Sequence, residues 1–314
     1  MPPRIASSPV SFGVFEFTDA LDGTPAPDDV LAAIRDAGYA GVELGPEGYL
    51  GADAAGVAAR LRAASLELAG VYLPLELTAP GAEDANLARV DRALEELAAA
   101  GGDRAVVMAA DAGDDATRQR MGRVLAGAED APDRATLDGV ARQLDAVHAR
   151  CAARGVVAVL HPHLGTHVET AAEIAHVLER SEIGLVLDTG HLAGAGAEPV
   201  AAAATWQGRI AHVHLKDVRL AELREVAAQR LGLLEMWRRA LFCPLGAGDV
   251  DLRTLLDGLR ASGYDGWLVV EQDRIVDWPA EGLDVAAADQ RANRAWLDAR
   301  LGRDTQDAGE ANTA

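Results

Sequence analysis

The 314-residue sequence is poor in cysteine and has no long apolar run. Its two cysteines, Cys151 and Cys243, lie far apart and outside any CxxC pattern, so neither a disulfide framework nor a thiolate zinc site is indicated. No stretch approaches the roughly 18 uninterrupted apolar residues of a membrane span, and the first residues lack the basic and apolar segments of a signal peptide. We therefore expect a cytoplasmic protein in a reducing compartment, with no membrane partner.

Positive charge is also scarce. The chain has 29 lysines and arginines against 49 acidic residues, which gives a formal net charge of −20. Nucleic-acid binding depends on cationic side chains that displace counterions from phosphates, so no DNA or RNA partner is expected. The acidic surplus itself is typical of a well-solvated surface and does not point to a substrate.

A glycine-rich nucleotide-binding fingerprint is the third absence. No GxGxxG or GxxxxGK[ST] pattern follows an early strand, which argues against a doubly wound open sheet. The sequence has instead a series of short apolar runs, separated by longer segments with helical spacing, and this alternation predicts βα units. The runs cover residues 9–17, 41–45, 67–75, 104–110, 156–163, 184–191, 210–217 and 266–273. Eight such units over nearly the whole chain predict an α/β fold of the (β/α)₈ TIM barrel type.

The domain organisation follows from this repeat. We expect one catalytic TIM-barrel domain over residues 1–302. Residues 218–248 form an insertion after the seventh run, which is either a functional lid or an extra helix that packs on the barrel. The polar tail, residues 303–314, is predicted to be disordered.

Polar residues with metal-binding chemistry gather at the ends of the later runs, where TIM barrels carry their active sites. Six of the eight histidines lie in or just after the fifth, sixth and seventh runs. Side chains alternate along a strand, and apolar ones must face the surrounding helices, so the polar ones point into the barrel. Four successive strands would thus bring His161, Asp188, His214 and Glu271 to one mouth, with His163 as an alternative to His161.

Such a set suits a divalent cation. Two carboxylates balance the charge, two neutral imidazoles complete the ligands, and converging carboxylates without a cation would repel one another. The mixed nitrogen and oxygen donors favour Mn²⁺ or Co²⁺, with Mg²⁺ or Zn²⁺ as further options.

Three further residues are candidates for contact with a substrate. Lys216 shares a strand face with His214, where it could hold an oxyanion or carry a proton; a salt bridge to a neighbouring carboxylate is the alternative. Asp217 follows directly and is expected near the substrate. Glu43, near the end of the second run, could bind a substrate hydroxyl or act as a base, or it could be a carboxylate outside the reaction.

Several segments, in this order, resemble the xylose-isomerase-like superfamily of sugar isomerases and epimerases, and most closely its inosose dehydratase branch. They are GVELGPEGY, HPHLGTHVET, GLVLDTGHLA, HVHLKDVR, PLGAGDVDL and WLVVEQD. The resemblance implies a TIM barrel that binds one divalent metal through Asp188, His214 and Glu271. Many relatives have a glutamate where this chain has His161, so the two-glutamate mechanism of the ketose 3-epimerases is not expected here.

The resemblance also implies an activity. It is that of a metal-dependent dehydratase, a lyase that removes water from a keto-inositol or related keto-polyol through an enediolate, as in inositol catabolism. His163 or His191 would take the proton, and Lys216 or the other histidine would protonate the departing hydroxyl. A sugar isomerase or epimerase is the alternative function, and a non-catalytic sugar-binding barrel is a third. A homo-oligomer is possible, although the sequence contains no decisive interface signal.

Overall fold

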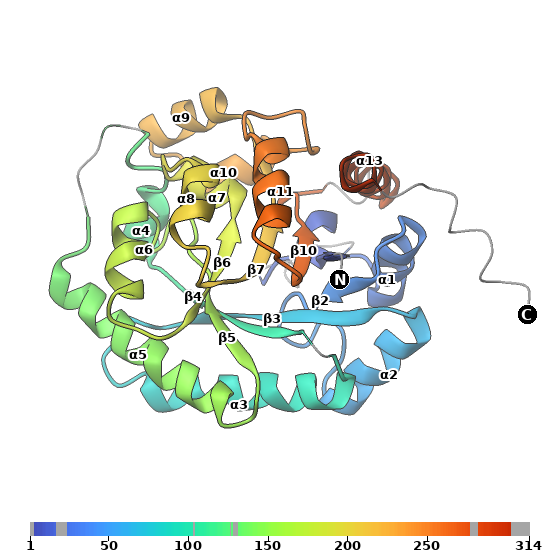
Figure 1. Cartoon of the computed structure of the whole chain (residues 1–314), viewed down its shortest axis with the longest axis horizontal. Coiled ribbons are helices and arrows are strands. Elements are labelled where there is room, and N and C mark those ends of the chain that lie inside the picture. The colour runs from blue at the N-terminus through green and yellow to red at the C-terminus, as the bar shows by residue number, and fades with distance from the viewer. Residues whose placement is uncertain are drawn as a thin grey trace, which may run out of the picture.

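The barrel architecture predicted from the sequence is confirmed. The computed structural model describes residues 3–16, 24–102, 104–125, 127, 131–276 and 282–302. Within these residues, eight parallel strands close into a barrel in the order β1-β10-β7-β6-β5-β4-β3-β2, with helices around the outside (Figure 1). The strands are β1 (Arg4–Ser7), β2 (Gly41–Glu43), β3 (Glu67–Leu75), β4 (Val106–Asp111), β5 (Val157–Leu160), β6 (Gly184–Asp188), β7 (Ile210–Leu215) and β10 (Trp267–Val270). The tail predicted to be disordered, residues 303–314, lies outside the described residues.

The second to eighth predicted runs each overlap a barrel strand, but the first prediction, residues 9–17, is wrong. Strand β1 precedes that run, and a 3₁₀ helix, η1 (Pro9–Phe12), lies within it; residue 17 is outside the described part. Pro9 explains the difference, because proline has no N–H for a β-ladder and its fixed φ suits the first turn of a helix.

Most helices that follow the strands cover the outside of the barrel: α1 (Pro27–Asp36), α2 (Ala54–Ala64), α3 (Glu83–Ala100), α5 (Arg134–Ala152), α6 (Ala171–Leu178), α8 (Pro199–Thr205), α11 (Leu252–Ala261) and α13 (Asp284–Leu301). Two short helices, α4 (Asp115–Gln119) and α7 (Thr189–Gly194), lie instead at the carboxyl end, where they contact the insertion at residues 218–248. Helix α1 begins at Pro27 and has two aspartates in its first turn, where acidic groups stabilise the positive end of the helix dipole. None of the helices in the described ranges combines the length and the apolar character needed to cross a bilayer.

The barrel strands separate two apolar regions by the alternation of their side chains. Outward-facing residues pack against the helices in the main core; they include Leu160, Leu187, Val213, Leu215 and Val270. Inward-facing residues fill the barrel; they include Val106, Met108, Val159 and Val186. At the amino end, Trp267 fits beside Gly41, where a Cβ atom would lie only 2.6 Å from the indole ring. The predicted strand parity is therefore confirmed, and it leaves the carboxyl end for polar groups.

The insertion at residues 218–248 is an ordered structure on the carboxyl end of the barrel. It contains α9 (Leu220–Ala228) and α10 (Gly232–Arg238), between the short antiparallel strands β8 (Asp217–Val218) and β9 (Phe242–Cys243). Leu223, Met236 and Phe242 of this segment pack with Leu164 and Ala193 in a separate apolar cluster. The insertion thus contains helices that pack on the barrel, and its action as a lid stays a prediction.

Candidate metal centre and active site

The four predicted metal ligands converge inside the carboxyl end of the barrel. His214 Nδ1 lies 3.0 Å from His161 Nε2, 3.0 Å from Glu271 Oε2 and 3.3 Å from Asp188 Oδ2. His161 Nε2 lies 3.5 Å from Asp188 Oδ2. All four residues are at most 5% exposed. The register of the barrel explains this meeting, because Asp188 on β6 lies directly beside His214 on β7.

Local structure fixes the direction of two of these side chains. Asp188 begins α7, and its Oδ1 accepts a hydrogen bond from the His191 N–H at 2.8 Å, which leaves Oδ2 for the centre. On the opposite side of His214, Nε2 lies 2.9 Å from Glu43 Oε1, which leaves Nδ1 for the centre. The ligand atoms of Asp188 and His214 are therefore each aimed by a second contact, as is usual for metal-binding side chains. His161 has no such contact among the described residues, since its Nδ1 is buried without a hydrogen-bond partner.

The geometry and charge of this set fit a divalent cation. Ligand atoms about 2.1 Å from a metal are about 3.0 Å apart in an octahedron and about 3.4 Å apart in a tetrahedron, close to the four separations given above. Atoms of His161, Asp188 and His214 all lie within 4.8 Å of one another, and Glu271 joins them through its contact with His214. Burial alone would lower the pKa of His214, but Glu271 and Glu43 raise it well above its ordinary value. Burial alone would raise the pKa of Asp188, but Lys216 and His191 hold it well below its usual range. The ionised carboxylates around His214 therefore favour a positive charge at the centre.

A second buried group lies beside the four ligands. Lys216 Nζ is 2.9 Å from Asp273 Oδ2, 3.0 Å from Glu271 Oε2 and 3.4 Å from Asp188 Oδ2. It is also 3.1 Å from His191 Nε2, and the rings of His191 and His163 have centroids 3.7 Å apart. Lys216 is thus in salt bridges, as one of the two alternatives predicted, and it also lines the cavity over the centre.

Hydrogen bonds distinguish the two histidines proposed as bases. His163 Nδ1 lies 2.8 Å from the Leu164 carbonyl oxygen, which can only accept, so Nδ1 carries the proton and Nε2 keeps its lone pair. His191 Nε2 instead faces the Lys216 ammonium group, which can only donate. Burial lowers the pKa of His163 to about 3, so this imidazole is neutral at neutral pH. Of these two histidines, His163 is therefore the one whose Nε2 lone pair has no hydrogen-bond partner within the described part of the chain, and it lines the cavity.

Glu43 is placed behind the centre. Its Oε1 is 2.8 Å from His212 Nε2 and 2.9 Å from His214 Nε2, and the residue is buried. Glu43 also lines the inner wall of the cavity, so a contact with substrate stays a prediction. Its hydrogen bonds give it a definite role in orienting His214.

Asp217 is placed in the framework of a loop and not in the cavity. It is fully buried, and its carboxylate accepts hydrogen bonds from the backbone N–H groups of Val218, Gly246, Gly248 and Val250. A Cβ atom at Gly248 would lie 2.3 Å from its Oδ1, so glycine is required for this approach. The position supports the loop after β9 and gives no support to the substrate contact expected from the sequence.

A cavity of about 850 Å³ opens over the centre, and several of its residues were not identified from the sequence. These are Tyr72, Asp111, Arg118, Trp237 and Asp273. Tyr72 meets His161 edge to face at 5.6 Å between centroids, and Trp237 on α10 stacks against Phe15 at 4.6 Å. Tyr72 and Asp273 follow the strand parity that located the metal ligands, whereas the place of Trp237 depends on how the insertion folds.

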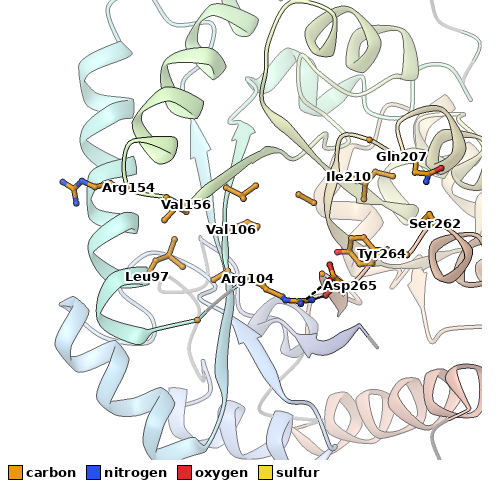
Figure 2. Close-up of a pocket in the computed structure, with 18 of the residues that line it drawn as sticks. Leu97, Arg104, Val106, Arg154, Val156, Gln207, Ile210, Ser262, Tyr264 and Asp265 are labelled. Atoms are coloured by element: carbon orange, nitrogen blue, oxygen red, sulfur yellow. Dashed lines mark hydrogen bonds and ion pairs between the residues drawn. The ribbon is translucent and has the colours of Figure 1, made fainter. Parts of the chain in front are cut away.

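The amino end of the barrel has a larger cavity, of about 970 Å³, with a different lining. Figure 2 shows Arg104 and Asp265 paired there beside Tyr264, and the pair is 2.9 Å apart. Among the described residues, the lining of this second cavity includes no histidine and a single carboxylate. It therefore offers no comparable set of ligands.

The fold and the polar mouth define the class of protein: a TIM barrel with a buried ligand set at the carboxyl ends of its strands. The chain belongs to the xylose isomerase-like TIM barrel family, whose model matches residues 31–298. This confirms the resemblance found in the sequence motifs.

Individual relatives agree with the family. The rhizopine catabolism protein MocC of Rhizobium meliloti is 32% identical over 276 residues, which cover 86% of this chain and 82% of that protein. An inosose dehydratase of Lacticaseibacillus casei is 35% identical over 123 residues, so the match spans 38% of this chain and only 41% of that enzyme's length. The solved structure of L-ribulose 3-epimerase matches 96% of this chain and 95% of its own, with a TM-score of 0.66 and 20% identity, a likeness of fold alone.

Proposed function

We propose that this protein is a metal-dependent dehydratase that removes water from a keto-inositol or a related keto-polyol. The observation that carries the proposal is the convergence of His161, Asp188, His214 and Glu271 beneath a cavity that His163 and Lys216 also line. The similarities to an inosose dehydratase and to a rhizopine catabolism protein support the choice of substrate class.

The four converging side chains would hold a divalent cation, and their mixed nitrogen and oxygen donors favour Mn²⁺ or Co²⁺ over the harder and softer alternatives. When bound, such a cation supplies Lewis acidity that makes a hydrogen next to a ketone more acidic. Burial in the barrel strengthens this effect, because the surrounding Val159 and Val186 layer excludes water from below.

The chain's own residues then move the protons. His163 Nε2, whose lone pair is not engaged by any described residue, accepts the proton from the carbon next to the ketone. The electrons of that C–H bond form the new C=C bond as the C–O bond to the next carbon breaks. Burial alone would lower the pKa of Lys216, but Asp188, Asp273 and Glu271 raise it well above its ordinary value, so it is an ammonium ion. It donates a proton to the departing hydroxyl, which leaves as water.

The experiment is direct. Protein loaded with Mn²⁺ is incubated with scyllo-inosose in D₂O, while the absorbance of an unsaturated ketone and the deuterium content of recovered substrate are followed. The proposal expects an absorbance increase that is lost in His163→Gln. Deuterium uptake without loss of water would instead indicate a sugar isomerase or epimerase, and no reaction with any of the four candidate metals would reject this substrate.

A further inference from the structure

Asp273 is a buried carboxylate in the cavity that the proposed chemistry leaves without a role of its own. It lies two residues after Glu271 and is 2% exposed, yet it lines the cavity. Its Oδ2 is held 2.9 Å from Lys216 Nζ. Its Oδ1 is buried and has no hydrogen-bond partner among the residues that the structure describes. Such an acceptor is costly to bury alone, so a donor at this position would stabilise it.

The residues around Asp273 could also be considered as ligands of a second metal ion. Ligand atoms of His163, His191 and Asp273 lie within 4.8 Å of one another, which is compatible with a cation. However, Lys216 Nζ already lies 2.9 Å from Asp273 and 3.1 Å from His191. Asp273 Oδ2 and His191 Nε2 therefore already have Lys216 as a hydrogen-bond donor. Of these two residues, the atom that still lacks a partner among the described residues and can accept a hydrogen bond is Asp273 Oδ1.

We propose that Asp273 Oδ1 accepts a hydrogen bond from a substrate hydroxyl, and that Lys216 holds the carboxylate in position for it. The inference rests on the proposed function, because the hydroxyl belongs to the keto-polyol at the metal centre. Lys216 separates Asp273 from the ligand Glu271, so this hydroxyl is on a ring carbon beyond those at the centre. Asp273 is thereby a specificity-determining residue that selects polyols with a hydroxyl at one position.

The test compares Asp273→Ala with the wild type on scyllo-inosose and on analogues in which one hydroxyl at a time is replaced by hydrogen. For one analogue, we expect the wild type to lose about 100-fold in kcat/KM, and the variant to treat that analogue and the parent alike. Asp273→Asn keeps an oxygen acceptor of the same size and should restore part of the discrimination. Asp265→Ala, at the opposite end of the barrel, is the matched control.

Two results would overturn the inference. One is an equal loss with the parent and every analogue, in a variant that still binds Mn²⁺, because a merely structural role gives no discrimination. If no ketone is turned over, the proposed function fails, and calorimetric titration of scyllo-inositol and its monodeoxy derivatives makes the same comparison by binding. The second overturning result comes from that titration. The inference fails if no inositol binds, or if wild type and variant bind every member of the series with equal affinity.

Discussion

The two ends of the barrel each have a cavity, and the larger one lacks the chemistry. The amino-end cavity has about 970 Å³ and the carboxyl-end cavity about 850 Å³. At the amino end, the Arg104–Asp265 pair is partly exposed, whereas Lys216 and its three carboxylates at the other end are almost fully buried. Exposed pairs contribute little stability, and buried charges are costly unless closely matched. Cavity size therefore does not identify the site, whereas the accumulation of buried charge does.

The largest predicted contrast is in turnover. We expect His214→Ala to reduce turnover of a keto-inositol about 10⁴-fold, since it removes a ligand at the centre of the cluster and with it several kcal/mol of transition-state stabilisation. Asp265→Ala at the amino end should leave turnover within about twofold, as typical for a surface pair. Steady-state kinetics with Mn²⁺ measures both. Similar losses in the two variants would erase the distinction between the two ends.

His163 should show the next largest effect. Replacement by glutamine is expected to lower kcat about 10²- to 10³-fold with a small change in KM, because the side chain keeps its size and loses its basic nitrogen. His191→Gln should lower kcat less, since the His191 lone pair faces Lys216. A larger loss in His191→Gln than in His163→Gln would reverse the assignment of the base.

Glu43 allows a comparison between a buried and an exposed carboxylate near the carboxyl end. Glu43→Gln removes the charge that orients His214, and we expect the affinity for Mn²⁺ to fall about 10- to 100-fold. Glu47→Gln, four residues later and about half exposed, is a control of the same chemistry. Calorimetric titration with Mn²⁺ gives both dissociation constants, and equal values for the two variants would refute the positioning role.

The smallest predicted effect concerns stability near the loop that carries the histidines. Glu169 is buried with Glu173 and shares one partner, Arg123, with it. Burial raises the pKa of Glu169 to about 7, so the protonated form is favoured in the folded state. Its contribution to stability is full below pH 4.5 and is lost as the pH rises to about 7.

We therefore expect Glu169→Gln to gain about 1–2 kcal/mol in unfolding free energy relative to the wild type between pH 5 and pH 8. Urea unfolding at the two pH values measures the difference. A constant difference across this range would show that Glu169 is ionised throughout, as an ordinary carboxylate is.

Strand parity explains how much of the site was predictable. Alternation brings His161, Asp188, His214 and Glu271 to one mouth, because neighbouring parallel strands place their carboxyl ends together. It could not choose between His161 and His163, which lie on the same strand face. The same rule could have excluded Asp217, which follows the inward-facing Lys216 and so faces the other way. It would also have identified Asp273, two residues after Glu271.

Features outside the regular strands were not predictable in this way. The apolar run at residues 9–17 has the composition of a strand, but Pro9 directs it into a 3₁₀ helix. Trp237 reaches the cavity only because α10 packs beside α4 and the loop after β5, an arrangement fixed by tertiary contacts and not by a local pattern. The prediction of an eight-unit barrel rested on the repeat of βα units, so the misplaced first strand did not change it.

The most direct test of the central claim is calorimetric titration of the metal-free protein with Mn²⁺ alone, beside Asp188→Asn and Asp265→Asn. Asparagine at position 188 keeps an oxygen that can cap α7, so the variant tests the ligand and not the fold. The account predicts one Mn²⁺ per chain for the wild type and Asp265→Asn, and affinity at least about 10²-fold weaker for Asp188→Asn. Equal binding by all three proteins, or no binding by the wild type, would contradict a metal centre at the carboxyl end of this barrel.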